Sequence, residues 1–246
     1  PGEDDITDEE LAELRKNKQR KQTLEDIKSR WSLDPKRAIE YMRKLEIIDD
    51  TPESLARFLY ATDGLDKKVL GEFIGGSKPF NKAVLHEYVC CFSFAGMQLD
   101  EALRYFLGMF LLPGEGQVVD RIMENFGAQY YKSNSKDTIF TDADAVYKLS
   151  YAIIMLATDL HNPKITNKLT FADFNKMVNK DLAMNCDEQY LRGVFDRIAA
   201  RKLELLDSSG SGGQCVISAF LNARQRQQLY LEETNKWVAT SMKQMR

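Results

Sequence analysis

The sequence predicts an all-α fold. Apolar residues recur every three or four positions along nearly the whole chain, which is the period of helices buried on one face. A capping residue precedes a proline at two places where such a pattern begins, Asp34-Pro35 and Thr51-Pro52. Sustained strand alternation and Asn-Gly hairpin turns do not occur in the sequence. We therefore expect antiparallel helices joined by short connections.

The first helix is expected to be charged and to run from Thr7, which forms a capping-box pattern with Glu10, to about Trp31. The next two helices begin at the Asp34-Pro35 and Thr51-Pro52 starts. The residues expected on their buried faces are Ala38, Met42, Leu45, Leu55, Phe58 and Leu59.

Glycines and a further apolar pattern define the next three helices. Gly75-Gly76 is expected to end the helix that contains Leu70 and Phe73, because glycine is common just after a helix. Another helix is expected from about Phe80 to Phe92. The one after it carries apolar residues at helical spacing, namely Leu99, Leu103, Phe106, Leu107 and Phe110.

The helix expected from about Asp142 to Leu160 carries two apolar stripes, whereas a surface helix needs one. The first stripe is Val146, Leu149, Ile153, Leu156 and Leu160, and the second is Tyr147, Tyr151, Ile154, Met155 and Thr158. Either the helix is central and buried, or its second face lines a groove. Two tyrosines and a methionine favour a partner surface, because such residues are enriched in interfaces. Asn162-Pro163 ends this helix, and a capping role for His161 and Asn162 is the simpler structural alternative.

Glu115 stands at the start of another helix, directly after the Pro113-Gly114 turn. No neighbouring charge in the sequence neutralises it. Acids are common at helix starts because the helix dipole favours them there, so a structural role is one reading. A presented acid beside an apolar groove indicates, alternatively, an intrusion into the charged site of another protein.

Composition divides the chain and limits its class. An acidic segment is expected at 1–14, a main domain at 15–206, a Gly/Ser-rich linker at 207–217 and a final helix at 218–246. With 34 basic and 37 acidic residues, the net charge of −3 argues against nucleic acid as the partner. The start lacks both a signal peptide and a Met, which predicts a fragment of a longer protein. Four cysteines without a CxxC, and two histidines, predict free thiols and no metal site.

Two motifs together resemble the Sec-seven domain, the catalytic module of guanine-nucleotide exchange factors for Arf small GTPases. The first family motif is close to F-R-L-P-G-E-A-Q-K-I-D-R, and residues 110–121 read F-L-L-P-G-E-G-Q-V-V-D-R. The second, I-I-M-L-x-T-D-L-H-N-P, is matched by residues 153–163 at every fixed position. Phe80-Asn81-Lys82 resembles a third segment. Residues 18–25 and 224–230 are most similar to the large brefeldin-inhibited Golgi class.

The resemblance implies a right-handed superhelix of about ten helices with a C-terminal helical extension. It implies that the chain promotes GDP release and GTP loading on an Arf-family GTPase in vesicle trafficking. No covalent chemistry and no cofactor of its own are then needed, since the exchange factor acts on GDP, GTP and Mg²⁺ held by the GTPase. The chain would be cytoplasmic and peripheral on Golgi or endosomal membranes, recruited through regions outside this sequence.

The resemblance also assigns residues. Glu115 would be the glutamate finger that displaces the nucleotide, with Asp120 near it and Arg121 holding the local helix ends together. Asn162 would contact the backbone of the GTPase. The residues expected to line the GTPase-binding groove are Tyr147, Tyr151, Ile154 and Met155.

The sequence departs from the family pattern at several positions. Leu111 replaces an arginine, Gly116 replaces an alanine and is expected to loosen the helix start, and Val118 replaces a lysine. Residues 178–181 replace the N-R-G-I segment that often follows the second motif.

Four positions determine inhibition by brefeldin in this family. Tyr151 and Asp159 match the sensitive pattern, whereas Ala152 and Leu169 stand where sensitive members carry serine and methionine. Weak or absent inhibition is therefore expected.

Two other function classes remain as alternatives. A non-catalytic helical scaffold that binds a small GTPase or another partner would use the same surface, with Glu115 as a plain helix starter. A hydrolase or di-iron enzyme is disfavoured, because the sequence has no E-x-x-H pair and nothing supports Glu115 and Asp120 as an acid and a base.

Overall fold

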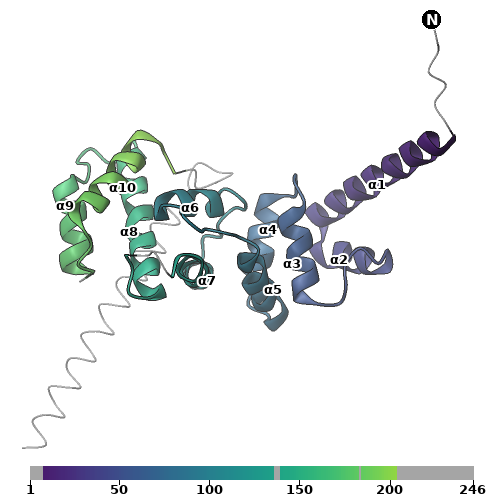
Figure 1. Cartoon of the computed structure of the whole chain (residues 1–246), viewed down its shortest axis with the longest axis horizontal. Helices are drawn as coiled ribbons and strands as arrows, with labels where there is room; N and C mark the ends of the chain where they lie inside the picture. Colours follow the sequence, from purple (N-terminus) through teal and green to yellow (C-terminus); the bar gives the residue numbers. More distant parts are fainter. Residues whose placement is uncertain (1–7, 136–138, 183, 204–246) are drawn as a thin grey trace, which may run out of the picture.

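The computed structural model describes residues 8–135, 139–182 and 184–203, and within these ranges it contains helices and no strand (Figure 1). The predicted all-α class is confirmed. The elements are α1 (Asp8–Leu33), α2 (Pro35–Lys44), α3 (Pro52–Ala61), α4 (Lys67–Ile74), α5 (Pro79–Cys90), α6 (Leu99–Leu107), α7 (Gly116–Asn134), α8 (Ala143–His161), α9 (Phe171–Lys176), the π-helix η1 (Met177–Asp181) and α10 (Glu188–Ala200).

The helices are arranged along the long axis of the molecule broadly in chain order, except that α10 turns back beside α8 and leaves α9 at the far end (Figure 1). Helices α1 to α5 form one end and α8 to α10 the other, with α6 and α7 between them. The most extensive pairings are α7 with α8, α3 with α5, and α1 with α2, and α8 also packs against α10. Gly127 permits the close approach of α7 to α8, since a Cβ there would lie 3.0 Å from the carbonyl oxygen of Ala143.

The predicted capping residues begin their helices as expected. The Asp34 carboxylate accepts hydrogen bonds from the amides of Lys36 and Arg37, and the Thr51 hydroxyl accepts one from the amide of Ser54. A proline occupies the first turn of both helices. Thr7 lies outside the described residues, as do the expected linker and final helix, whereas α1 runs without a break through residue 14.

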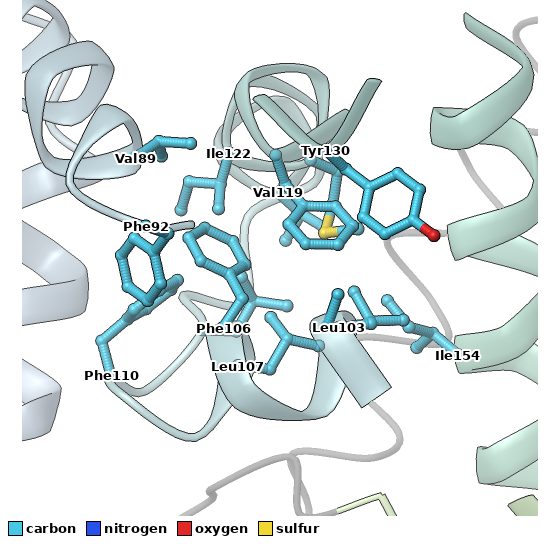
Figure 2. Close-up of a cluster of buried hydrophobic side chains, with 14 of the residues drawn as sticks. Val89, Phe92, Leu103, Phe106, Leu107, Phe110, Val119, Ile122, Tyr130 and Ile154 are labelled. Carbon is cyan, nitrogen blue, oxygen red and sulfur yellow. The ribbon is translucent and has the colours of Figure 1, made fainter. Parts of the chain in front are cut away.

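A cluster of aromatic rings lies within the core at the junction of α5, α6 and α7 (Figure 2). Phe92, Phe106 and Phe126 are fully buried, and the ring centroids of Phe106 and Phe126 are 5.1 Å apart. The prediction that Leu45 is buried was wrong, because its side chain is 43% exposed. Helical spacing places Ala38 and Met42 in the core. Because helix α2 ends at Lys44, this spacing does not extend to Leu45.

An ion pair with a buried carboxylate joins α6 to α10. Asp100 on α6 is 1% exposed, and the Arg197 guanidinium on α10 donates to both of its carboxylate oxygens, at 2.9 and 2.7 Å. The hydrogen bond to Asp100 raises the pKa of Arg197 above its already high ordinary value. The Arg104 guanidinium, one turn along α6, donates to the carbonyls of Arg201 and Lys202 and so fixes the end of α10.

Replacing Arg197 by Ala should lower the free energy of unfolding by about 3 kcal/mol, because it leaves the Asp100 carboxylate buried without its partner. Urea unfolding at neutral pH measures this loss. The double change Asp100→Asn with Arg197→Ala should be less damaging than Arg197→Ala alone, because no buried charge remains. Equal stability of the two variants would mean that the pair is not desolvated.

Candidate functional site

Glu115 is the last residue of the loop between α6 and α7, residues 108–115, which we call the acid loop. It is the N-cap of α7, but its side chain does not bond to the helix amides and is exposed to solvent. Instead, its backbone carbonyl accepts from the amides of Val118 and Val119, each at 3.0 Å. Within the described part of the chain, the Glu115 carboxylate forms no hydrogen bond or ion pair. The acid is therefore presented rather than used for capping, and Gly116 does not prevent a regular helix start.

The acid loop lies directly on the backbone of α4. The amide of Leu111 donates to the carbonyl of Lys67 at 2.8 Å, and the Lys67 ammonium donates to the carbonyl of Gly108 at 2.6 Å. A Cβ on Gly71 would lie 1.8 Å from the Leu111 carbonyl oxygen, so only glycine allows this approach. The loop is thus held by direct backbone contact at Leu111, and by the Lys67 side chain at Gly108.

Gly75, one turn along α4, extends the same close contact. A Cβ there would lie 2.6 Å from Cγ1 of Val118 and 3.2 Å from Cγ of Pro113. The backbone of Gly75 is right-handed, with φ of −73°, so its role is to leave space and not to adopt a left-handed cap. Val118, which replaces a lysine of the family motif, therefore packs against the end of α4.

Two side chains hold the end of α4 in place. The Arg121 guanidinium, from α7, donates to the carbonyl of Gly75 and, at 3.3 Å, to that of Gly76. The Asn81 amide, from α5, donates to the carbonyl of Phe73 at 2.7 Å. Both bonds satisfy carbonyls that a helix end leaves without a partner. The expected role of Arg121 at the local helix ends is confirmed, and the Phe80-Asn81-Lys82 segment reaches the acid loop through α4.

Asp120 and two tyrosines connect α7 to α8. The hydroxyl of Tyr151 donates to the Asp120 carboxylate, and the hydroxyl of Tyr147 approaches the same oxygen at 3.4 Å. The two rings meet edge to face with centroids 4.7 Å apart. Burial raises the pKa of Tyr147 to about 12, and burial followed by the bond to Asp120 raises the pKa of Tyr151 further. Both hydroxyls therefore remain protonated donors at neutral pH.

Helix α8 is central, and its second stripe is partly open. The first stripe is buried up to Leu156, whereas Tyr147, Tyr151, Met155 and Thr158 are half-buried. The prediction that Ile154 lines the groove was wrong, because its side chain is fully buried. It points into the apolar cluster near Leu103 and Leu107 of α6 (Figure 2). One position along a helix is enough to rotate a residue from an open face into the core.

The segment after α8 folds back onto its last turn. The Asp159 carboxylate accepts from the amide of Leu169 at 2.6 Å, and the Lys168 ammonium donates to the carbonyls of Asp159 and Asn162. Two of the four positions expected to determine inhibition, Asp159 and Leu169, thus contact each other directly. Ala152 lies two turns away and is buried, with 2% of its surface exposed.

His161 and Asn162 have different roles at this helix end. The His161 ring donates through Nε2 to the carbonyl of Ile198 at 2.7 Å, which joins α8 to α10. The side-chain oxygen of Asn162 accepts from the amide of Lys164 at 2.9 Å, whereas its amide nitrogen has no partner among the described residues. His161 is therefore structural, and the half-exposed Asn162 retains a free donor.

The segment that replaces N-R-G-I lies in η1 and is bonded to the backbone that follows it. The Asn179 amide donates to the carbonyl of Cys186 at 2.9 Å, and its side-chain oxygen accepts from the amide of the same residue. Cys90, Cys91 and Cys186 are free thiols, as predicted, and Cys215 lies outside the described residues. In the ranges that the structure describes, no group of three metal-binding side chains comes together, and no helix is both long and apolar enough to span a membrane.

The contact between the acid loop and α4 was missed by reasoning from the sequence. Its signal is present, since Gly71 stands inside a helical pattern, one turn before the glycines that end it, and a glycine there indicates close packing. The pattern does not say which backbone approaches.

Comparison with known proteins agrees with the motifs. The sequence model of the Sec7 domain matches residues 20–203. Human brefeldin A-inhibited guanine nucleotide-exchange protein 1 is 40% identical over 193 residues, which cover 78% of this chain and 10% of that protein. The chain thus spans about a tenth of the length of the first curated relatives that it matches.

Two solved structures share the fold. The catalytic domain of Sec7p is 37% identical with a TM-score of 0.68, and the match covers 73% of this chain and 95% of that one. A Sec7 domain solved with ARF1-GDP and brefeldin A is 31% identical with a TM-score of 0.66, covering 76% of this chain and 95% of the other.

Replacing Gly71 by Ala should lower the free energy of unfolding by about 2 kcal/mol or more, because the new methyl group must push the Leu111 carbonyl away from α4. Thermal or urea unfolding measures the change. Gly193→Ala is the matched control, since there the added methyl meets only the tip of the Arg197 side chain, at 3.1 Å. That variant should be near wild type, and an equally tolerated Gly71→Ala would show that the acid loop is not seated on α4.

Proposed function

The chain belongs to the Sec7 domain family, and on that premise we propose that it is a guanine-nucleotide exchange factor for an Arf-type small GTPase. The related exchange proteins and the Sec7 domain solved with ARF1-GDP support this assignment. The exchange factor forms no covalent bond. It binds the nucleotide-free GTPase more tightly than the loaded one, and by linkage it lowers the affinity of the GTPase for nucleotide.

One observation carries the proposal, which is the presented carboxylate of Glu115 on a rigid support. An acid moved toward the β-phosphate of GDP repels it, disturbs the bound Mg²⁺ and competes for the phosphate-binding lysine of the GTPase. Two unit charges about 4 Å apart at an effective dielectric near 20 interact by about 4 kcal/mol, which corresponds to roughly a thousandfold in rate. The glutamate finger can act only if its backbone is not displaced when it meets the phosphate. The contact of the acid loop with Gly71 prevents that displacement.

The half-buried face of α8 supplies the second part of the site. Tyr147, Tyr151 and Met155 present partly open apolar surface beside the Asp120 carboxylate, and Asn162 presents a free amide donor at the end of the same helix. We assign this face to the switch regions of the GTPase. Ile154 supports the face from within the core.

The wider role follows from the same assignment. The chain needs no cofactor, since the nucleotide and Mg²⁺ belong to the GTPase. Loading an Arf-type GTPase with GTP places the protein in vesicle trafficking, peripheral on Golgi or endosomal membranes and recruited by regions beyond this sequence.

The decisive experiment measures release of a fluorescent GDP analogue from a panel of Arf-type GTPases, with and without the chain. Release should accelerate by orders of magnitude for at least one of them. Binding without acceleration would support the non-catalytic scaffold, and the absence of both would refute the proposal.

Replacing Glu115 by Lys should reduce exchange at least a hundredfold, because the finger would then attract the phosphates it must repel. The melting temperature should stay near that of the wild type, since the carboxylate is exposed and unbonded within the described chain. Glu124→Lys, on the exposed side of the same helix, is the control with an identical charge change. Exchange at the wild-type rate in Glu115→Lys would remove Glu115 from the mechanism.

Replacing Met155 by Ala should weaken binding of the GTPase by about 2 kcal/mol, because half-buried apolar residues on this face act as anchors. Calorimetric titration with nucleotide-free GTPase measures the affinity, and thermal melting measures stability. Ile154→Ala is the contrasting variant, and its main effect should be on stability. Loss of stability with normal affinity in Met155→Ala would assign Met155 to the core instead.

Brefeldin should inhibit the wild-type chain weakly or not at all, and Ala152→Ser should increase inhibition. A serine at this buried position introduces a hydroxyl next to Tyr151, whose own side chain lies on the face assigned to the GTPase. Dose–response curves for exchange at a fixed GTPase concentration test this. Ala152→Val, which adds bulk without a hydroxyl, is the control. Strong inhibition of the wild-type chain would show that Tyr151 and Asp159 determine sensitivity by themselves.

A further inference from the structure

Helix α5 carries a cysteine and a histidine on the side that faces α7. His86 and Cys90 are one turn apart, and the Cys90 sulfur lies 3.9 Å from Nε2 of the His86 ring. The side-chain oxygen of Asn125, on α7, lies 3.4 Å from the other ring nitrogen, Nδ1. His86 is exposed and Cys90 is half-buried, so a small molecule in solvent can reach the sulfur. A thiol, an imidazole and a side-chain amide thus follow one another across the contact between α5 and α7.

The hydrogen bonds of Asn125 determine which nitrogen of His86 carries the proton. The Asn125 amide nitrogen donates to the carbonyl of Arg121 at 2.8 Å, and a carbonyl can only accept. The amide oxygen of Asn125 therefore faces His86, and Nδ1 must be the protonated nitrogen that donates to it. In the neutral ring, Nε2 is then left with its lone pair beside the Cys90 thiol. His86 is consequently placed to accept the proton of Cys90.

The other described thiols are placed differently. Cys91 is next in the sequence, but successive side chains of a helix point in different directions, and its thiol donates to the carbonyl of Glu87 at 3.3 Å. Burial raises the pKa of Cys91, and burial also raises the pKa of Cys186. A thiol with a raised pKa stays protonated at neutral pH and is a poor nucleophile. Cys91 and Cys186 are therefore unactivated thiols of the same protein, with which Cys90 can be compared.

We propose that Cys90 is a nucleophilic thiol that low-molecular-weight disulfides modify, with His86 as its base and Asn125 as the residue that positions His86. The thiol proton passes to Nε2, and the thiolate attacks one sulfur of the small disulfide. The sulfur–sulfur bond of the small molecule breaks as the new bond to Cys90 forms. The departing thiolate takes the proton from the imidazolium and leaves as a thiol. Cys90 is thereby oxidised, and the departing half of the disulfide is reduced.

The product is a mixed disulfide that Cys91 does not resolve. Adjacent Cα atoms are about 3.8 Å apart across a trans peptide bond, whereas an unstrained disulfide needs about 4.4 Å or more. The adduct therefore stays on Cys90 until an external thiol removes it. The modification is reversible, and it adds one half of the disulfide to the surface between α5 and α7.

Rates of modification by hydroxyethyl disulfide, an uncharged probe, test the proposal. No lysine or arginine stands between residues 83 and 103, so trypsin leaves Cys90 and Cys91 in one peptide, 83–104. Cys91→Ala and Cys90→Ala each leave a single thiol in that peptide, and mass spectrometry then follows each thiol by itself. Cys90 should react about tenfold or more faster than Cys91, as expected of a thiol with a positioned base. Equal rates for the two thiols would overturn the proposal.

The base is tested by His86→Gln in the Cys91→Ala protein. The rate at Cys90 should fall about tenfold, because glutamine does not take up the thiol proton. The melting temperature should stay near that of the parent, since the His86 side chain is exposed. Lys82→Gln, one turn earlier on the same face, is the matched control. It lies about 12 Å from Cys90 along the helix, beyond the Debye length at physiological salt, so it should leave the rate unchanged. An unchanged rate in His86→Gln would show that His86 does not activate Cys90.

A pair of substitutions at Asn125 separates positioning from stability. Asn125→Leu and Asn125→Asp both lose the amide donor to the carbonyl of Arg121, so that loss is common to the two variants. Only the aspartate keeps an oxygen that accepts from Nδ1 of His86. The rate at Cys90 should fall severalfold in Asn125→Leu and be retained in Asn125→Asp. Equal rates in the two variants would overturn the positioning role of Asn125.

Discussion

The Leu111 carbonyl packs directly against the backbone of Gly71, in the space that a side chain would fill. This contact is the constraint on which the site depends. Backbone packed on backbone has no rotamers to change, so the acid loop cannot relax toward α4 or slide along it. The Lys67 carbonyl fixes the register of this contact by accepting from the amide of Leu111. Arg121 then reaches back from α7 to hold the end of α4, so the loop before Glu115 and the helix after it are both attached to α4. Each of these contacts is common by itself. Together they fix the backbone from which the exposed Glu115 carboxylate projects.

The same helix carries the second part of the site. Helix α7 packs against α8 through Gly127, and the Asp120 carboxylate receives the two tyrosine hydroxyls of α8. The acid loop and the half-buried face of α8 are therefore two ends of one packed unit. A GTPase that touches both meets a surface whose internal distances are already set. Little ordering free energy then has to be lost on binding, which is the physical advantage of a preorganised interface.

Much of the fold and part of the site could be predicted from the sequence, for reasons that depend on range. Capping by Asp34 and Thr51 is local chemistry, so the sequence predicts it directly. The apolar stripes of α8 also follow from local spacing. Which stripe faces outward depends on neighbours far along the chain, and for that reason Ile154 was assigned to the wrong surface. The prediction that Leu45 is buried was wrong because α2 ends at Lys44, one residue before it. The partner of Gly71 is 40 residues away, and no local pattern identifies it.

The two acids of the first motif show why position on a helix decides function. Glu115 and Asp120 are both acids and are only five residues apart, but their surroundings differ. Asp120 lies on the side of α7 that meets α8, where two tyrosine hydroxyls donate to its carboxylate and hold it in the structure. Glu115 lies before the first turn, where it faces solvent and its own helix amides do not bind it. Asp120 is held in place by its hydrogen bonds and cannot move toward a partner, whereas the Glu115 side chain has no such bond among the described residues and can approach one. The first motif therefore contains one acid that is bonded within the structure and one that is presented to solvent, and the packing of α7 against α4 and α8 distinguishes them.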